Sequence, residues 1–163
     1  MKRTYLILLM TFSLLMTLCP SASATGAAVL AESDNPSPAA LEFLRKHPGG
    51  ALVGHNEVAY ADGTGFVAIE VGTMSVSQCG SGRFCTWSSP SYTGSFTYTT
   101  GTNVTRTLGR SVKSFWNNRS QAARLYNNAG SASTCYAAGT KKSSLAVAYQ
   151  TPAKVYLSAG TAC

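Results

Sequence analysis

The chain has 163 residues, with thirteen basic and six acidic side chains that give it a net charge of +7. All six acidic residues and both histidines precede residue 71, whereas residues 71–163 carry nine bases and no carboxylate side chain. A Ser–His–Asp triad or a carboxylate pair cannot be built within residues 71–163, so we expect no catalytic residues and no enzymatic activity.

The first residues have the pattern of an export signal. Lys2 and Arg3 precede an apolar run from Tyr5 to Leu18, and the small residues "ASA" at 22–24 offer a cleavage site. The apolar run has 14 residues, whereas a membrane-spanning helix needs about 20. We therefore predict a signal peptide over residues 1–24 and a secreted protein.

The predicted mature chain keeps four cysteines: Cys79, Cys85, Cys135 and Cys163. An even number of cysteines in an exported chain indicates two disulfides. Three pairings are possible, and the close spacing of Cys79 and Cys85 favours Cys79–Cys85 together with Cys135–Cys163. No histidine lies near any of these cysteines, so we expect no zinc site. We expect no other metal and no cofactor.

Residues 25–75 are predicted to form an acidic N-terminal segment with a leader, a short helix and a hairpin. The run "PSPAALEFLRKHPGG" predicts the helix, because Ser37 can cap its start, Pro38 suits its first turn and Pro-Gly-Gly ends it. The run "ALVGHNEVAYADGTGFVAIEV" then predicts a β-hairpin with Asp62 and Gly63 in its turn.

Residues 76–163 are predicted to form a basic domain of short strands. The strand-like runs, separated by Gly, Ser, Thr and Asn clusters, are "RFCTW", "SFTYTT", "SVKSFW", "AARLYN", "SSLAVAYQ" and "AKVYLSA". The stretch "RSQAARLYNN" could alternatively form a helical turn, and we favour a strand there. Regularly spaced short strands with turn signals are typical of a β-sandwich, so we predict an all-β fold after the helix and hairpin.

An aromatic pattern follows the close cysteine pair in "CGSGRFCTWSSPSYTG". Trp87, Tyr92 and Gly94 fit the aromatic-x4-aromatic-x-Gly signature of a βγ-crystallin Greek-key motif, in which an aromatic corner packs over a folded hairpin and the glycine takes a positive φ. Together with "SFWNNRSQAARLYNN" downstream, this stretch resembles the actinobacterial secreted peptidase-inhibitor family typified by the Streptomyces metalloproteinase inhibitor. The resemblance implies a βγ-crystallin-like Greek-key sandwich and inhibition of a protease.

The same resemblance implies a reactive bond. In the family, this bond follows a disulfide-bonded cysteine in an exposed loop after the "RLY" strand. Here the loop corresponds to Ser131–Thr140, and Cys135 and Tyr136 hold the matching positions. A disulfide-tethered loop can enter a protease cleft like a substrate and leave slowly, because its ends stay held after cleavage. The implied partner is an extracellular protease, and the large apolar Tyr136 favours the metalloprotease class.

Calcium-binding members of the crystallin superfamily use the motif Asn/Asp-Asn/Asp-x-x-Ser/Thr-Ser. Asn117 and Asn118 match its first two positions, but Gln121 and Ala122 stand where hydroxyl residues are expected. Calcium is a hard cation that normally needs carboxylate oxygens, and this segment has none. We therefore expect Asn117 and Asn118 to cap the end of a strand, without a calcium site.

The basic domain allows an alternative function. A carboxylate-free domain with nine bases should attract anionic cell-surface polymers or membranes. This predicts a cationic, crystallin-like surface-binding or toxin-like module without inhibitory activity, whose binding weakens with added salt. Export and the lack of a nucleic-acid motif argue against nucleic acid as a partner. We expect a monomer.

Overall fold

The computed structural model describes residues 35–69, 76–108, 110–152 and 154–163. The predicted signal peptide, residues 1–24, lies outside the described residues, as does most of the predicted leader. Among the helices that the structure describes, none has the length and apolar character that crossing a membrane requires.

The predicted helix near the N-terminus is confirmed as α1 (Pro38–Lys46). The Ser37 hydroxyl oxygen caps its start by accepting a hydrogen bond from the backbone amide of Ala40 (3.2 Å). One face of the helix packs on the hairpin that follows, where the rings of Phe43 and Phe66 stack with their centroids 4.0 Å apart. The helix therefore depends on the hairpin for its apolar contacts.

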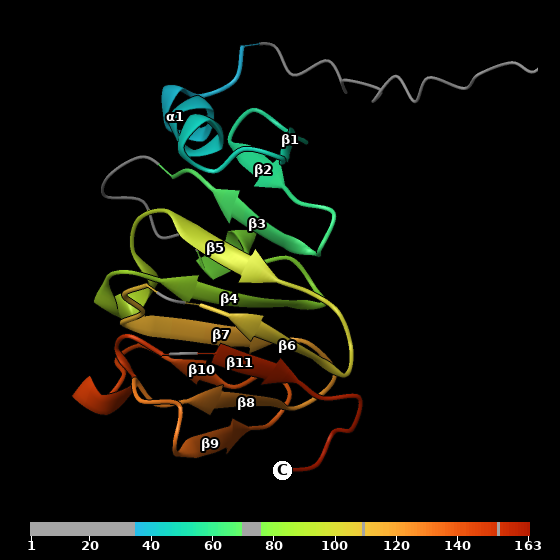
Figure 1. Ribbon diagram of the computed structural model, residues 1–163, viewed down its shortest axis with the longest axis vertical. Coiled ribbons are helices and arrows are strands. Elements are labelled where there is room, and N and C mark those ends of the chain that lie inside the picture. The colour runs from blue at the N-terminus through green and yellow to red at the C-terminus, as the bar shows by residue number, and fades with distance from the viewer. Residues whose placement is uncertain (1–34, 70–75, 109, 153) are drawn as a thin grey trace, which may run out of the picture.

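The predicted hairpin is confirmed by strands β1 (Ala51–Leu52), β2 (Glu57–Ala59) and β3 (Thr64–Val67). Its turn contains Gly63 at φ +84°, and the Asp62 carboxylate accepts a hydrogen bond from the Thr64 amide (2.9 Å). On its other side, β3 pairs with β5 (Phe96–Thr99). The hairpin therefore continues a sheet of the basic domain (Figure 1).

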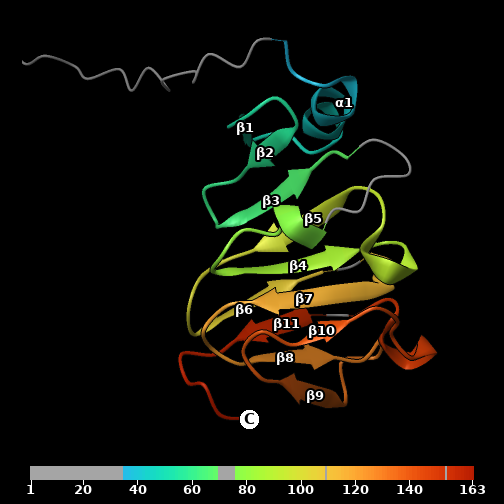
Figure 2. The same ribbon diagram turned by 180° about the vertical axis from the view of Figure 1, so that it is seen from behind.

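In the part of the chain that the structure describes, eleven strands form two antiparallel sheets, which confirms the predicted all-β fold. The seven-stranded sheet has the order β1-β2-β3-β5-β4-β7-β10, and the four-stranded sheet has the order β6-β11-β8-β9. The remaining strands are β4 (Arg83–Trp87), β6 (Val104–Thr107), β7 (Ser114–Asn118), β8 (Ala123–Tyr126), β9 (Ser133–Tyr136), β10 (Lys141–Lys142) and β11 (Lys154–Leu157). Figures 1 and 2 show α1 and β9 at opposite ends of this stack.

The strands from β4 onward form two units of four. In the first unit β5, β4 and β7 are neighbours, while the third strand, β6, lies in the other sheet. In the second unit β11, β8 and β9 are neighbours, while the third strand, β10, crosses back to pair with β7. Each unit thus gives one strand to the opposite sheet, which is the arrangement expected of the Greek-key sandwich that the family resemblance implied.

The main core lies between the two sheets. Phe84 and Phe115 of the large sheet stack at 5.2 Å and face the aliphatic side chains of the small sheet, and all of these residues are fully buried. The predicted aromatic corner is also present, because the Trp87 and Tyr92 rings meet edge to face at 5.5 Å. Gly94 has φ +75°, the left-handed conformation that the motif requires.

A cluster of polar contacts joins the N-terminal hairpin to the basic domain. The Glu57 carboxylate accepts hydrogen bonds from the Arg83 guanidinium (2.7 Å) and from the Tyr98 hydroxyl (2.8 Å). The Arg83 guanidinium also lies 3.8 Å from the centre of the Tyr98 ring. Gly65 on β3 leaves room for that ring, since a Cβ there would meet it at 2.2 Å. An acid of the N-terminal segment is thereby paired with a base of the domain.

The prediction of a strand at "SSLAVAYQ" is wrong. This run contains the short 3₁₀ turn η3 (Val147–Tyr149), and two further 3₁₀ turns are η1 (Val76–Gln78) and η2 (Pro90–Tyr92). A hydrogen bond joins the two ends of the loop that contains η3, since the Gln150 side-chain amide donates to the Leu145 carbonyl (2.9 Å). The Leu145 side chain is buried and anchors this loop. Alternating apolar residues here therefore mark a buried anchor and an exposed tip, rather than one face of a strand.

Candidate functional site

The predicted reactive residues Cys135 and Tyr136 lie at the end of β9, at one edge of the four-stranded sheet. In register with β8, Cys135 is opposite Arg124 and Tyr136 is opposite Ala123. Among the strands that the structure describes, none pairs with the other side of β9. The segment expected as one exposed loop is therefore a strand over residues 133–136, with exposed residues before and after it.

Cys135 is held through its side chain. The structure joins Cys135 to Cys163 and Cys79 to Cys85, which is the pairing that the sequence favoured. The Cys135–Cys163 bridge links the edge strand to a residue 28 positions further along the chain, with the two Cα atoms 5.5 Å apart. The bridge and the pairing with β8 together fix the backbone on the N-terminal side of the predicted reactive bond.

Tyr136 is half-buried rather than fully exposed. Its ring meets the Phe115 ring edge to face at 4.6 Å and packs against the main core. Burial raises the pKa of the Tyr136 hydroxyl above its usual value. Side chains alternate along a strand, so Cys135 points to the disulfide while Tyr136 points to the core. The exposed residues next to the bond are Ala137 to Gly139.

The buried residue Asn117 holds the C-terminal side of the same bond. Its side-chain amide donates to three carbonyl oxygens, those of Gln121 (2.9 Å), Tyr136 (3.3 Å) and Ala137 (3.0 Å). Its backbone amide donates to the Thr140 carbonyl (2.9 Å), and its backbone carbonyl accepts from Gly139 (2.8 Å). One asparagine therefore holds the backbone at residues 136, 137, 139 and 140 through hydrogen bonds.

Asn117 and Asn118 end strand β7, and both use their side-chain amides as donors. Asn118 donates to the Cys79 carbonyl (2.6 Å), which ties the strand end to the Cys79–Cys85 disulfide. Among the described residues, no group of three or more His, Cys, Asp or Glu side chains could hold a metal ion. The expectation that calcium does not bind at Asn117 and Asn118 stays a prediction.

A second exposed feature lies beside β9 and was missed by the sequence analysis. Val147, at the start of η3, is 77% exposed between Ala146 and Ala148. The turn projects from the side of the stack at the β8–β9 end in both views (Figures 1 and 2). An apolar tip with small neighbours is the signal that could have identified it, but the alternation in "SSLAVAYQ" indicated a strand instead.

The η3 turn is fixed to the residues next to β9. The Asn128 side-chain amide donates to the Val147 carbonyl (3.1 Å), and the Asn128 backbone amide donates to the Ala148 carbonyl (2.8 Å). The Thr134 hydroxyl of β9 donates to the Tyr149 hydroxyl oxygen (3.0 Å). The edge strand and the Val147 tip therefore form one connected surface, which we call the β9–η3 surface.

Basic side chains around this end of the molecule face solvent. Lys141 and Lys142 on β10 are exposed, and the Lys141 ammonium lies 4.1 Å from the centre of the Trp116 ring. The ion pairs among the described residues are Lys46–Glu42 and Arg83–Glu57, both of which use acids of the N-terminal segment. The remaining bases of residues 76–163 therefore keep their positive charge unpaired by carboxylates in the described part of the chain.

Comparison with known proteins gives one match. Residues 72–138 match the family model of peptidase inhibitor family I36, the family of the Streptomyces metalloproteinase inhibitor. No curated protein and no solved structure matches the chain. The matched residues begin near the end of the predicted N-terminal segment, include strands β4 to β9 and end two residues after Tyr136, so they include the predicted reactive bond. The resemblance that the sequence indicated is confirmed.

Proposed function

Because residues 72–138 match peptidase inhibitor family I36, a family of inhibitors and not of enzymes, we propose that the protein is a secreted proteinase inhibitor directed at metalloproteases. The family match is the observation that carries this function. The two disulfides support an oxidising, extracellular location, since such bonds persist outside the cytosol.

We place the reactive bond between Cys135 and Tyr136, on the open edge of β9. Extended peptides bind to proteins by adding a strand, so an unpaired edge can enter a protease cleft in the manner of a substrate. Tyr136 can fill the pocket after the bond only if its ring turns away from Phe115, and the lost packing then subtracts from the binding energy.

Slow release after cleavage follows from how the two sides of the bond are held. The Cys163 disulfide and the pairing with β8 keep Cys135 in place. The Asn117 amide keeps the Tyr136 and Ala137 carbonyls in place. The new ends would stay close together at high effective concentration, which favours resealing of the bond over loss of the product.

We propose the Val147 tip as a second contact with the protease. It is exposed, apolar and part of the β9–η3 surface, and its backbone is already fixed by Asn128. A contact that is rigid before binding loses little conformational entropy on association. Lys141 and Lys142 lie nearby in sequence and favour a partner with an acidic rim.

The test is inhibition by residues 25–163 with both disulfides formed. We expect slow, tight inhibition of a thermolysin-like metalloprotease and much weaker inhibition of a serine protease, which controls for target class. After reduction of the disulfides, mass measurement of the recovered inhibitor should show two pieces that result from a single cut between Cys135 and Tyr136. Inhibition of the serine protease alone would contradict the target class, and a cut at another bond would contradict the reactive site.

The cationic surface-binding module remains the second candidate, because residues 76–163 carry solvent-facing bases and no carboxylate side chain. It predicts binding to vesicles with anionic headgroups at low salt, and release at about 1 M salt, where the screening length falls to about 3 Å. Vesicle binding without inhibition of any protease in the panel would favour this module. Inhibition without vesicle binding would exclude it.

A further inference from the structure

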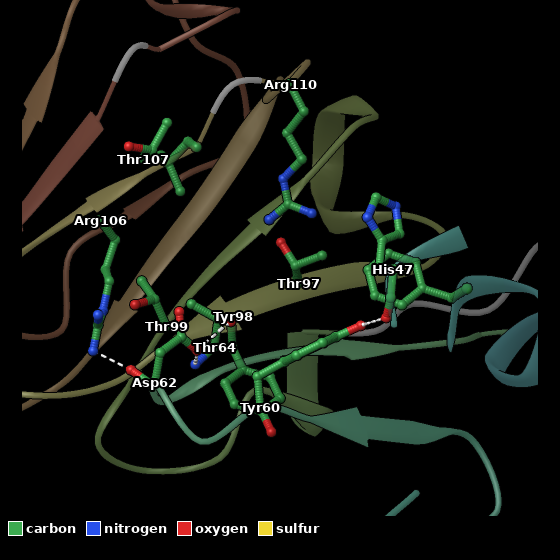
Figure 3. A pocket seen from close by; sticks show the side chains of 13 residues that line it. His47, Tyr60, Asp62, Thr64, Thr97, Tyr98, Thr99, Arg106, Thr107 and Arg110 are labelled. Carbon is green, nitrogen blue, oxygen red and sulfur yellow. Dashed lines mark hydrogen bonds between the residues drawn. The ribbon is translucent and has the colours of Figure 1, made fainter. Parts of the chain in front are cut away.

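A cavity of about 480 Å³ is lined by residues of both the N-terminal segment and the basic domain (Figure 3). Its wall comes from four places in the chain: the end of α1, the β2–β3 hairpin, strand β5, and residues 106–108 and 110 in and after β6. Strand β5 and the residues in and after β6 lie within the family match over residues 72–138. Helix α1 and the β2–β3 hairpin lie outside it.

Arg110 extends its guanidinium into this cavity, above Thr97 (Figure 3). One of its nitrogens, Nη2, donates to the Thr86 hydroxyl (3.0 Å). Among the described residues, no carboxylate forms an ion pair with Arg110. Burial lowers the pKa of Arg110 to about 10, so the group is still a cation at neutral pH. A desolvated cation without an anionic partner is costly, and proteins usually pair such a charge.

Two polar groups of the cavity wall lack hydrogen-bond partners within the described part of the chain. The Thr99 hydroxyl and the Arg106 Nε are buried, and neither makes a hydrogen bond within the described part of the chain. Another nitrogen of Arg106 donates to the Asp62 backbone carbonyl, so the side chain is positioned while its Nε is not satisfied. Native structures leave few buried polar groups unpaired, and two of them beside a guanidinium that has no anionic partner indicate a ligand that would complete them.

The rest of the wall is mainly apolar or neutral. Phe43, Tyr60 and Leu108 supply rings and a branched side chain. Tyr60 donates its hydroxyl to the His47 carbonyl, as the dashed line in Figure 3 shows, so its ring is held in place. The acid in the lining, Asp62, turns its carboxylate to the Thr64 amide and hydroxyl. The cavity is thus cationic on one side and aromatic on the other.

We propose that this cavity binds a small organic carboxylate with an aromatic or apolar body. The carboxylate pairs with Arg110, whose guanidinium offers parallel N–H donors that match its two oxygens. The body packs against Phe43, Tyr60 and Leu108. Because the wall is shared, the ligand contacts both the N-terminal segment and the domain, and its binding holds the two together. This site is independent of protease inhibition.

The first test uses thermal unfolding of residues 25–163 with benzoate as the probe. At a concentration ten times its Kd, benzoate should raise the Tm by about 4 °C. Benzyl alcohol, which has the same ring and no charge, should give no shift at equal concentration. Inorganic phosphate in place of benzoate should also give none. A shift with benzyl alcohol or phosphate and not with benzoate would overturn the carboxylate class.

The second test separates a binding arginine from a structural one. Arg110→Gln should abolish the benzoate shift while leaving the Tm of the ligand-free protein unchanged or higher, because it removes an unpaired buried charge. Arg124→Gln is the matched control: it makes the same charge change on β8, where Arg124 contacts Ser133, and should keep the shift. A lower ligand-free Tm with an unchanged benzoate shift would assign Arg110 a structural role and overturn the proposal.

A milder variant keeps the test valid if Arg110→Gln does not fold. Arg110→Lys keeps the positive charge but loses the parallel donors, so we expect benzoate to bind about tenfold more weakly by calorimetry. Equal affinity for Arg110→Lys and the unchanged protein would mean that the guanidinium does not hold the ligand.

Discussion

At the β9 end of the molecule, asparagine side chains hold backbone carbonyls beside the candidate reactive bond, whereas at the junction with the N-terminal segment an arginine faces a cavity without an anionic partner among the described residues. Asn117 and Asn128 each fix backbone carbonyls beside the β9–η3 surface. Around the cavity, Arg110 has one hydrogen bond among the described residues and the Thr99 hydroxyl has none. A surface that meets a large partner without deforming needs a backbone that is already held in place. A cavity that a small ligand completes needs polar groups that are still able to bind it.

The largest effect is expected from removing the support of the β9 end. Asn117→Ala takes hydrogen bonds from three carbonyls in a buried place, so we expect a loss of about 3 kcal/mol in the free energy of unfolding. Inhibition should become temporary, because the C-terminal side of the bond is no longer held after cleavage. Denaturant titration and inhibition over several hours measure the two effects.

Asn118→Ala is the control for this change, since its side chain makes one hydrogen bond, to Cys79. It should cost about 1 kcal/mol and leave inhibition lasting. Lasting inhibition by Asn117→Ala would mean that the Asn117 hydrogen bonds do not hold the C-terminal side of the cleaved bond.

A smaller effect is expected at Tyr136. Tyr136→Ala removes a half-buried ring from Phe115 and should cost about 2 kcal/mol of stability, so the substitution is not neutral as an exposed loop residue would be. Inhibition should weaken by at least roughly 30-fold if the ring fills the pocket after the bond. Tyr136→Phe keeps the ring and should retain both properties. Inhibition constants and melting curves for the three proteins decide this.

The third effect is confined to binding. Val147→Ser should weaken inhibition about tenfold, and the Tm should not change because the side chain is exposed. Val53→Ser provides a control at the opposite end of the molecule, where Val53 is 48% exposed, and it should change neither quantity. Equal inhibition constants for all three proteins would remove η3 from the inhibitory surface.

The smallest effect concerns the junction at high pH. Burial, reinforced by the hydrogen bond to Glu57, raises the pKa of Tyr98 to about 12. The folded protein therefore favours the protonated hydroxyl more than the unfolded chain does, whose tyrosines ionise near pH 10. The resulting stability is complete below about pH 10 and is lost as the pH rises toward 12.

Denaturant titrations between pH 9 and pH 12 should show a loss of about 1–2 kcal/mol from this group. Tyr98→Phe should flatten the profile in that range. Tyr156→Phe, which removes a surface hydroxyl bonded to Asn103, should not flatten it. Identical profiles for both variants would mean that Tyr98 is not the group that titrates with unfolding.

The sequence predicted those parts of the fold in which neighbouring residues carry the information. The run "RFCTW" became β4 residue for residue, and "RSQAARLYNN" contains a strand as favoured, because alternating burial is a local pattern. Strands β6 and β9 were missed, since their Val, Ser and Thr side chains are partly exposed and resemble the surrounding loops. "SVKSFW" begins its strand only at Ser114.

The candidate sites were predicted less well, because they depend on contacts between distant residues. Cys135 and Tyr136 were located by family resemblance, but the inward direction of Tyr136 depends on the position of Phe115 in another sheet. Asn117 attracted attention as part of a calcium-like motif, whereas its contact with the Tyr136 carbonyl joins residues 19 positions apart. The cavity around Arg110 is built from four separate segments and leaves no pattern in the sequence.

The pairing of β3 with β5 has a consequence for solubility. Without residues 35–69, β5 would become an outer strand, and the backbone groups of Phe96 to Thr99 that now bond to β3 would be open to other chains. Uncovered strands of this kind favour self-association between copies. The hairpin therefore seals one side of the sheet, and a protein shortened by proteolysis to residues 76–163 should form oligomers or precipitate at concentrations at which the longer chain stays dispersed.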